Sequence, residues 1–507
     1  MLLPCLPRCL PRCLPRRVSL RQTLVTLAIE SSCDDTAVAV LSHTRHRTEL
    51  LFNERICSDN RAFKGVHPVV TVQGHNTSLA PLVQRALLAL PDAVEESSSS
   101  ASSASASSSS SSPPHICVSS SHGTLHKRRP DFVSVTRGPG IMANLAVGLN
   151  MAKGLAVAWD VPLVGVHHMQ AHALTPRLVA ALERPQPLSA HDDDTARSCD
   201  HVDNNNNNDD DEINTSLHTP HFPFLTLLVS GGHTQLVHST GLTEHRILAT
   251  TSDIAIGNLL DQTARVILPP DVLASSPDVM YGRLLESFAF PPPAAAAADD
   301  DDTHHQHHDF FHPALSRHDE ISPVPTPYPW TIPLPFRNTR RLAYSFSSIH
   351  THVHRIAHDI PPTDIPQRRC LARHTLRAAF QHLASRLVLA LQDLPDLQSF
   401  SSASRTHDDD SSSSTTTTLV LSGGVASNQF LRHVLRETLS ARGFPGLHIL
   451  APPAALCTDN AAMVAWTAME MFERGWSSEL SIRPVGKWPM SVAGQDAILG
   501  MEGWMRR

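Results

Sequence analysis

Several features typical of membrane or secreted proteins are missing from this chain of 507 residues. No apolar run reaches the length that a membrane-spanning helix needs, so we expect no membrane partner. The nine cysteines include no CxxC pair and show no disulfide-like spacing, which is typical of a reducing compartment or of isolated thiols. The length predicts two or more domains with ample core.

The first 21 residues carry five arginines, but they contain no acidic residue and no apolar run of the length found in secretory signal peptides. Such a start does not resemble a secretory signal but is typical of an organellar transit peptide. We therefore predict that residues 1–22 direct the protein to the mitochondrion. Prolines would interrupt the amphipathic helix of such a peptide, so a disordered basic arm or an incorrectly assigned start codon is the alternative. These prolines are Pro4, Pro7, Pro11 and Pro15.

The net charge of −7 is unevenly distributed along the chain. Segments 192–212, 299–309 and 398–410 are strongly acidic, whereas the first 21 residues are basic. Without these segments, the remainder carries a small positive charge. That charge permits a polyanionic partner such as nucleic acid but does not require one.

Four low-complexity stretches interrupt the periodic sequence. They are rich in Ser at 95–121, in Asp and Asn at 190–215, in Pro, Ala, Asp and His at 290–312, and in Ser and Thr at 398–418. None has enough apolar residues to offset the entropy lost on ordering. We predict that all four are disordered surface insertions.

Between these stretches, strand patterns and helix patterns alternate, which predicts an α/β protein. The predicted strands are 24–30, 37–41, 132–136, 161–166, 224–230, 235–239 and 419–422. The predicted helices are 142–159 and 168–181, with others beginning near Asn428 and Ala461.

Paired glycines follow two of the apolar strands. They occur in Ser230-Gly-Gly-His-Thr234 and in Ser422-Gly-Gly-Val-Ala-Ser-Asn428. Glycines let backbone N–H groups approach an anion without interference from a Cβ, and a following helix N-terminus favours phosphate. Each turn alone is more often an ordinary tight turn. Two together indicate two related lobes that face a shared nucleotide cleft.

His168 and His172 lie four residues apart, directly after an apolar run, so on a helix both imidazoles share a face and can bind one divalent ion. Spacing alone is weak evidence, because the chain has 32 histidines and buried or solvent-facing histidines are more common. The same spacing occurs in the pairs His122/His126, His304/His308 and His350/His354.

Carboxylates gather at three other places. Three lie within Glu30-Ser-Ser-Cys-Asp-Asp-Thr36, Asp253 and Asp261 are eight residues apart around Gly257, and Asp459 precedes a predicted helix. Helix capping or simple solvation is the default interpretation of each. Asp34 and Asp35 are the candidates for a general base.

Nine motifs in colinear order resemble the tRNA N6-adenosine threonylcarbamoyltransferase family, which has the older name glycoprotease-like. They are Ile29-Glu-Ser-Ser-Cys-Asp-Asp-Thr36, Lys64-Gly-Val-His-Pro68 with His75, Thr136-Arg-Gly-Pro-Gly140, His167-His-Met-Gln-Ala-His172, Leu228-Val-Ser-Gly-Gly-His-Thr-Gln235, Asp261 with its neighbours, Ser345-Phe-Ser-Ser-Ile349, Ser422–Asn428 and Thr458-Asp-Asn-Ala-Ala-Met463. They span the chain outside the insertions and the arm. The Arg-rich start is similar to the mitochondrial branch.

The resemblance implies two actin-like and sugar-kinase-like (ASKHA) α/β lobes around a nucleotide cleft. The first lobe would be 23–166 and the second 167–454, with 455–507 returning to the first. A divalent metal ion of the Fe or Zn type would be held by His168, His172 and Asp459. Threonylcarbamoyladenylate would be bound by Leu228, Val229, Ser230, Gly231, Gly232, Asp261, Gly282 and Asn428.

Four positions depart from the family pattern. Gly282 follows Tyr281 where the family has a Tyr-Pro-Gly-Gly-like stretch, and Gln262, Asn258 and His350 replace a common lysine, acid and lysine. These departures affect fine contacts rather than the reaction class.

The activity implied is transfer of a threonylcarbamoyl group to N6 of the adenosine immediately 3′ of the anticodon, with release of AMP. The implied partners are tRNA, L-threonylcarbamoyladenylate and, as a candidate, a second copy of the chain. Lys127-Arg-Arg129 and Arg340-Arg341 are candidate tRNA phosphate contacts, with solvated surface as the alternative.

Three other activities compete with this one. An ATP-dependent small-molecule kinase shares the fold but needs no His-His-Asp site. A metallopeptidase needs His-Glu-x-x-His, whereas Met169 and Gln170 follow His168 here. A non-catalytic scaffold would need neither the ligands nor both glycine turns.

Overall fold

The computed structural model describes residues 23–63, 65–93, 115–121, 123–184, 219–276, 280–291, 307, 309–397, 417–490 and 497–507. The predicted transit peptide, most of the four predicted insertions and the pair His304/His308 lie outside these residues, as does His122. Within them, no helix is both long enough and apolar enough to cross a membrane.

A seven-stranded sheet contains the N-terminal strands and the C-terminal strands. Its order is β14-β13-β7-β6-β1-β2-β3. β1 pairs with β6 in parallel and with β2 antiparallel, and β6 pairs with β7 in parallel. The bounds are β1 Leu24–Glu30, β2 Asp35–His43, β3 Thr48–Cys57, β6 Phe132–Gly138, β7 Leu163–His167, β13 Trp476–Ser478 and β14 Trp504–Arg506. Every residue of β1, β6 and β7 is buried, as expected for parallel strands covered on both faces.

A five-stranded sheet repeats the same plan. Its order is β10-β9-β8-β11-β12, with β8 antiparallel to β9 and parallel to β11. The bounds are β8 Phe224–Val229, β9 Thr234–Ser239, β10 His245–Thr250, β11 Thr418–Ser422 and β12 His448–Leu450. The order β3-β2-β1-β6-β7 in the first sheet matches it strand for strand. This repetition confirms the predicted α/β class with two related lobes.

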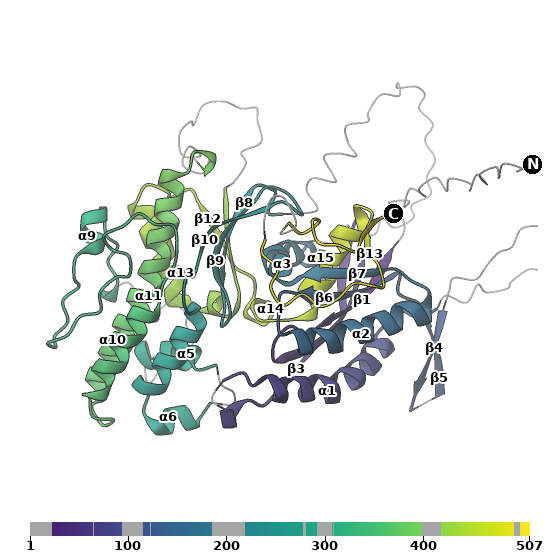
Figure 1. Cartoon of the computed structure of the whole chain (residues 1–507), viewed down its shortest axis with the longest axis horizontal. Coiled ribbons are helices and arrows are strands. Elements are labelled where there is room, and N and C mark those ends of the chain that lie inside the picture. Colours follow the sequence, from purple (N-terminus) through teal and green to yellow (C-terminus); the bar gives the residue numbers. More distant parts are fainter. Residues whose placement is uncertain are drawn as a thin grey trace, which may run out of the picture.

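Helices cover the sheets on both faces (Figure 1). On the first sheet, α1 Pro68–Leu88 and α2 Met142–Trp159 pack on one face. On the other face, α3 His168–Leu182 and α15 Ala461–Glu473 share a core that also includes Phe224 and Val420 of the second sheet. These two helices therefore lie between the lobes.

The largest core forms around the second sheet. Its longer helices are α5 Ile256–Ile267, α7 Gly282–Ala289, α10 Ser347–His358, α11 Ile365–Asp393 and α13 Gln429–Ala441. Short helical segments are η1 Arg61–Phe63, α6 Pro270–Ala274, α9 Arg317–Ile321, η2 Pro395–Leu397, η3 Gly424–Ser427 and α14 Ala454–Cys457. The predicted division into 23–166, 167–454 and 455–507 stays a prediction.

Three predictions of disorder were wrong in part, and in the stretch 398–418 only Thr418, the first residue of β11, is affected. Residues 115–120 of the Ser-rich stretch form β4 (His115–Ser120), which pairs with β5 (Gly123–Arg128) in a separate hairpin. Alternate residues of β4 point inward, and Val118 is buried, so a short apolar face suffices once a partner strand completes the hydrogen bonds. In the stretch 290–312, Phe311 is buried in the core of the second lobe because aromatic side chains near the end of this stretch supply apolar area.

Candidate functional site

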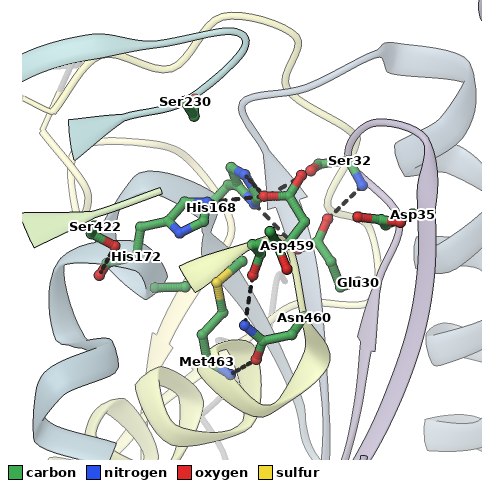
Figure 2. A network of polar contacts seen from close by, with 12 residues as sticks. Glu30, Ser32, Asp35, His168, His172, Ser230, Ser422, Asp459, Asn460 and Met463 are labelled. Carbon is green, nitrogen blue, oxygen red and sulfur yellow. Dashed lines mark hydrogen bonds and ion pairs between the residues drawn. The ribbon is translucent and has the colours of Figure 1, made fainter. Parts of the chain in front are cut away.

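His168, His172 and Asp459 meet where β7 ends and α15 begins (Figure 2). Nε2 of His172 lies 3.0 Å from Oδ1 of Asp459, and Nε2 of His168 lies 3.5 Å from the same oxygen. One ligand atom from each residue lies within 4.8 Å of those of the other two. The three side chains are therefore close enough to hold one ion, although 287 residues separate His172 from Asp459.

Local structure explains these positions. His167 ends the buried strand β7 and caps α3, because its Nδ1 accepts a hydrogen bond from the backbone N–H of Gln170 at 3.3 Å. His168 is then the first helical residue, and His172 lies one turn later on the same face. On the other side, Asn460 caps α15 by accepting a hydrogen bond from Met463 N at 2.9 Å, which places Asp459 just outside the helix.

A buried ion pair joins α3, which carries both histidines, to α15, which begins two residues after Asp459. Arg177 of α3 donates to both carboxylate oxygens of Glu470 in α15, with N···O distances of 2.8 and 2.9 Å. Both side chains are almost fully buried, and the Arg177 guanidinium also lies over the ring of Phe222. The pair therefore holds α3 and α15 in one relative position, as a bidentate arginine contact does.

Glu30, at the end of β1, lies behind His168. Its Oε2 is 3.2 Å from Nδ1 of His168, and its Oε1 accepts from the backbone N–H of Ser32 at 2.6 Å. Thr136 donates a hydrogen bond to the same carboxylate. Since a carboxylate only accepts, Nδ1 of His168 donates to it, and Nε2 is left to face Asp459.

The charges of these groups are coupled. Burial opposes ionisation of Asp459, but His168 and His172 hold the pKa of its carboxyl well below the ordinary value. Burial likewise disfavours the His168 cation, yet Glu30 and Asp459 raise the pKa of His168 to about 10. Two buried carboxylates around one imidazole thus favour positive charge at this point.

The donor set fits a divalent transition metal. Two imidazole nitrogens and one carboxylate oxygen suit Zn²⁺ or Fe²⁺ and leave other coordination positions for substrate. Nδ1 of His172 is buried without a hydrogen-bond partner among the described residues, so the ring is oriented from its other nitrogen, by the contact of Nε2 with Asp459. His168, in contrast, has the outer carboxylate partner that metal-binding histidines usually have.

The two glycine turns lie against each other next to this cluster. A Cβ on Gly423, whose φ is +93°, would lie 2.4 Å from Val229 O and 3.2 Å from Ser230 Cβ. A Cβ on Gly424 would lie 3.7 Å from Thr458, the neighbour of Asp459. Ser422 also donates to the carbonyl of His172 at 2.7 Å. Both turns therefore face the same place as the ligand trio.

The predicted adenylate-binding residues differ in their exposure and in their contacts. Leu228 and Val229 are buried in β8, so a ligand can reach only their backbone, whereas Gly231 and Gly232 are exposed and Ser230 is half-buried. Asp261 accepts a hydrogen bond from Gly282 N at 3.0 Å, so these two residues do come together. The Asn428 side chain is buried and caps α13 by accepting from Leu431 N at 2.9 Å.

Known proteins match the chain over most of its length. A family model described as TsaD, tRNA N6-adenosine threonylcarbamoyltransferase, matches residues 104–192 and 212–466. A mitochondrial tRNA N6-adenosine threonylcarbamoyltransferase of Schizosaccharomyces pombe is 30% identical over 500 residues, which cover 96% of this chain and 90% of the relative. The chain belongs to this threonylcarbamoyltransferase family. It is therefore a transferase of the tRNA-modifying class.

Other matches are more distant. The tRNA N6-adenosine threonylcarbamoyltransferase of Bartonella henselae is 28% identical over 467 residues, which cover 92% of this chain and 94% of the relative. The crystal structure of T. kodakarensis HypF is 12% identical, with a TM-score of 0.34, and the match covers 89% of this chain and 47% of that chain.

The older glycoprotease-like name of the threonylcarbamoyltransferase family implies a peptidase, but neither Met169 nor the next residue, Gln170, supplies a carboxylate base. The Gln170 side chain is buried and donates to Leu242 O at 2.8 Å and to the sulfur of Met471. A zincin places a glutamate at the position that follows the first ligand histidine, where it activates water. This chain has Met169 there, so the site lacks that base.

Sequence patterns did not reveal several residues that shape the site of this transferase. Glu30 was visible only as one of three neighbouring carboxylates, and nothing in its spacing pointed to His168. Arg55 of β3 bonds to both Asp35 and Thr458, at 3.1 and 2.7 Å, and so joins the first lobe to the Asp459 loop. Such a contact joins residues that are far apart in the sequence, so no local sequence pattern indicates it.

The predicted phosphate contacts have partners within the protein. Lys127 pairs with Asp92 at 2.6 Å and is buried, and Arg128 pairs with Asp131 at 2.9 Å. Arg340 pairs with Asp393. These three side chains are therefore engaged within the protein, and their predicted contact with tRNA phosphates stays a prediction.

Proposed function

We propose that this chain transfers the threonylcarbamoyl group from L-threonylcarbamoyladenylate to N6 of the adenosine immediately 3′ of the anticodon. The tRNAs would be mitochondrial ones that read codons beginning with adenine, and AMP would be released. One observation carries the proposal: the two glycine turns meet beside His168, His172 and Asp459. Family membership supplies the reaction class.

The reaction joins an activated carbonyl to a poor nucleophile. The N6 lone pair is delocalised into the adenine ring, so the enzyme must orient both reactants and stabilise the charge that develops. A bond forms between N6 and the carbonyl carbon as the bond from that carbon to the phosphate oxygen breaks. AMP leaves with the electron pair of the broken bond, and N6 loses one proton.

The glycine turns are the proposed binding site for the phosphate end of the adenylate. Gly231 and Gly232 are exposed and Gly424 is partly exposed, and a glycine places no Cβ beside its backbone N–H group, which favours an anion here. Asp261 and Gly282, on neighbouring helices, and Asn428 at the start of α13 would bind the nucleoside part. A divalent ion held by His168, His172 and Asp459 would supply Lewis-acid polarisation of substrate oxygens.

Asp35 is the proposed acceptor for the N6 proton. Its carboxyl is buried beside Arg55, and one of its oxygens has no hydrogen-bond partner among the described residues. Burial, partly offset by Arg55, raises the pKa of Asp35 to about 7, which suits a base that works near neutral pH. Asp34 is the alternative, but its carboxylate is in contact with the Cys57 thiol at 3.7 Å.

Three further features belong to the proposal. The metal would be of the Zn or Fe type, one per subunit. The protein would act in the mitochondrion, to which residues 1–22 would direct it. The S. pombe relative is itself named as a mitochondrial enzyme. A homodimer is a candidate assembly.

The test uses a strain that lacks the mitochondrial modification. Expression of this chain should restore threonylcarbamoyladenosine in digested mitochondrial tRNA, measured by mass spectrometry. His168→Ala and Asp459→Ala should abolish the modification while circular dichroism stays unchanged, and His448→Ala, an exposed histidine elsewhere, should behave as wild type. Absence of the modified nucleoside with the wild-type chain would overturn the proposed function.

A further inference from the structure

The β4–β5 hairpin carries a second cluster of metal-ligating side chains. Cys117 of β4 lies directly opposite His126 of β5 in the strand register, and His115 lies two residues before Cys117. Residues two apart on a strand point to the same face. All three side chains are exposed, whereas Val118 on the opposite face is buried.

The distances within this cluster match those of a metal site. Sγ of Cys117 lies 3.8 Å from Nδ1 of His126, and the rings of His115 and His126 have centroids 5.2 Å apart. One ligand atom from each residue lies within 4.8 Å of the other two, as in the cluster of His168, His172 and Asp459. Cys117 is a free thiol.

The hairpin is held in place on its other edge. The backbone N–H of Ala93 donates to His126 O at 3.0 Å, and that of Arg128 donates to Pro91 O at 2.8 Å. On the inner face, Lys127 pairs with Asp92 at 2.6 Å. β5 is therefore held between residues 91–93 and β4. Its His126 thus has a defined position relative to His115 and Cys117.

The neighbouring cation does not oppose a metal ion strongly. Arg128 lies opposite His115 in the register, but its guanidinium donates to Asp131 at 2.9 Å and to Thr23 O at 2.6 Å. These contacts hold the guanidinium near the start of β1. In Figure 1 the hairpin lies beyond the ends of α1 and α2, away from the region between the two sheets where α3 and α15 lie.

We propose that His115, Cys117 and His126 bind one Zn²⁺ ion as a clip between β4 and β5. Two imidazoles and a thiolate suit Zn²⁺ and disfavour Mg²⁺ and Ca²⁺, which prefer oxygen ligands. On binding, the Cys117 thiol releases its proton to solvent as the Zn–S bond forms, and water takes the fourth position. The ion joins the two strands of the hairpin, so its role is structural.

Cobalt gives a specific test, because a Co²⁺–thiolate bond has a near-ultraviolet charge-transfer band that histidine and carboxylate ligands lack. Metal-free full-length protein, kept reduced, is titrated with Co²⁺. The band should appear with the wild-type chain and disappear in Cys117→Ser, His115→Ala and His126→Ala. It should persist in Cys370→Ser and in His46→Ala, which change a thiol and an exposed histidine outside the hairpin.

Zinc affinity and exchange provide independent readouts. Chelator competition should give an affinity for Zn²⁺ at this site at least about tenfold weaker in each ligand variant. Hydrogen exchange of residues 115–128 should slow on addition of Zn²⁺ in the wild-type chain but not in Cys117→Ser. A band that survives Cys117→Ser, or zinc binding that is unchanged in all three variants, would overturn the proposal.

Transfer activity separates this site from the proposed catalytic one. Cys117→Ser should leave tRNA modification unchanged, whereas His168→Ala should abolish modification and keep the cobalt–thiolate band. Loss of the band in His168→Ala with retention in Cys117→Ser would assign the thiolate to the first cluster and refute the hairpin site.

Discussion

Glu30 accepts a hydrogen bond from Nδ1 of His168 across 3.2 Å, although 138 residues separate them in the chain. Neither side chain is accessible to solvent to any useful extent. The contact selects the tautomer of His168 that offers Nε2 to the cluster, and it fixes the plane of the ring. Glu30 is therefore a positioning residue for His168.

Replacing Glu30 should weaken metal binding more than it disturbs the fold. We expect Glu30→Gln to lower the affinity for Zn²⁺ about 10–100-fold, because an amide is a weaker acceptor and does not add negative charge. Equilibrium dialysis measures the affinity. Glu54→Gln, at an exposed carboxylate that pairs with Arg85, is the matched control and should retain the wild-type affinity. An unchanged affinity in Glu30→Gln would show that the contact is only structural.

The pH dependence of transfer should report on Asp35. Since the pKa of Asp35 is raised to about 7 by burial, a reaction that needs the ionised carboxylate slows by about tenfold per pH unit well below pH 7. Asp35→Asn should be slow and should lose this acid limb. Single-turnover rates between pH 5 and pH 9 measure the profile. An acid limb that persists in Asp35→Asn belongs to another group.

The same carboxyl makes stability depend on pH with a defined sign. The folded protein holds the Asp35 proton up to about pH 7, whereas an aspartate of ordinary pKa, 3.8, has lost it. The folded state therefore binds more protons in this window, and the free energy of unfolding falls as the pH rises from about 4 to 7. Urea unfolding should show a smaller fall across this window in Asp35→Asn than in the wild type.

Gly257 should tolerate no side chain. A Cβ there would lie 2.7 Å from both Gly231 N and Ser230 O, so alanine must displace the first glycine turn. We expect a loss of about 10–100-fold in kcat/KM for the adenylate, because small misplacements in a binding turn are costly. Gly154→Ala is the control: nothing described lies within 4 Å of its Cβ, and alanine in a helix should add about 0.5–1 kcal/mol of stability.

Arg177 should be important for stability and for the site together. Arg177→Met removes the bidentate partner of the buried Glu470 and leaves its contact with the half-exposed Arg474 at 3.5 Å, so we expect a loss of up to about 3–5 kcal/mol, as for other broken buried pairs. Denaturant unfolding should show this loss. The double variant Arg177→Met/Glu470→Leu should recover a large part of it, since no buried charge then remains unpaired. A double variant as unstable as Arg177→Met would mean that packing, rather than charge, carries the effect.

Local patterns were sufficient for the strands and helices that position the site. The apolar strand that ends at His167, and the helix that follows it, were predicted within two residues of their observed bounds. The edge strands β3 and β10 were missed because many of their residues are only partly buried, so the apolar pattern is weak. The hairpin strand β4 was missed because its Ser-rich surroundings hid a short alternating pattern.

Sequence by itself determined the fold class, the two glycine turns and the identity of the ligand candidates. Hydrophobic periodicity and turn residues are local properties, and the family motifs preserve their order along the chain. Only the tertiary structure decided which carboxylate lies behind His168, that Arg55 joins Asp35 to Thr458, and that Gln170 is turned away from the site. Those contacts join residues that are far apart in sequence, and packing of α3 and α15 between the sheets brings them together, which no local pattern encodes.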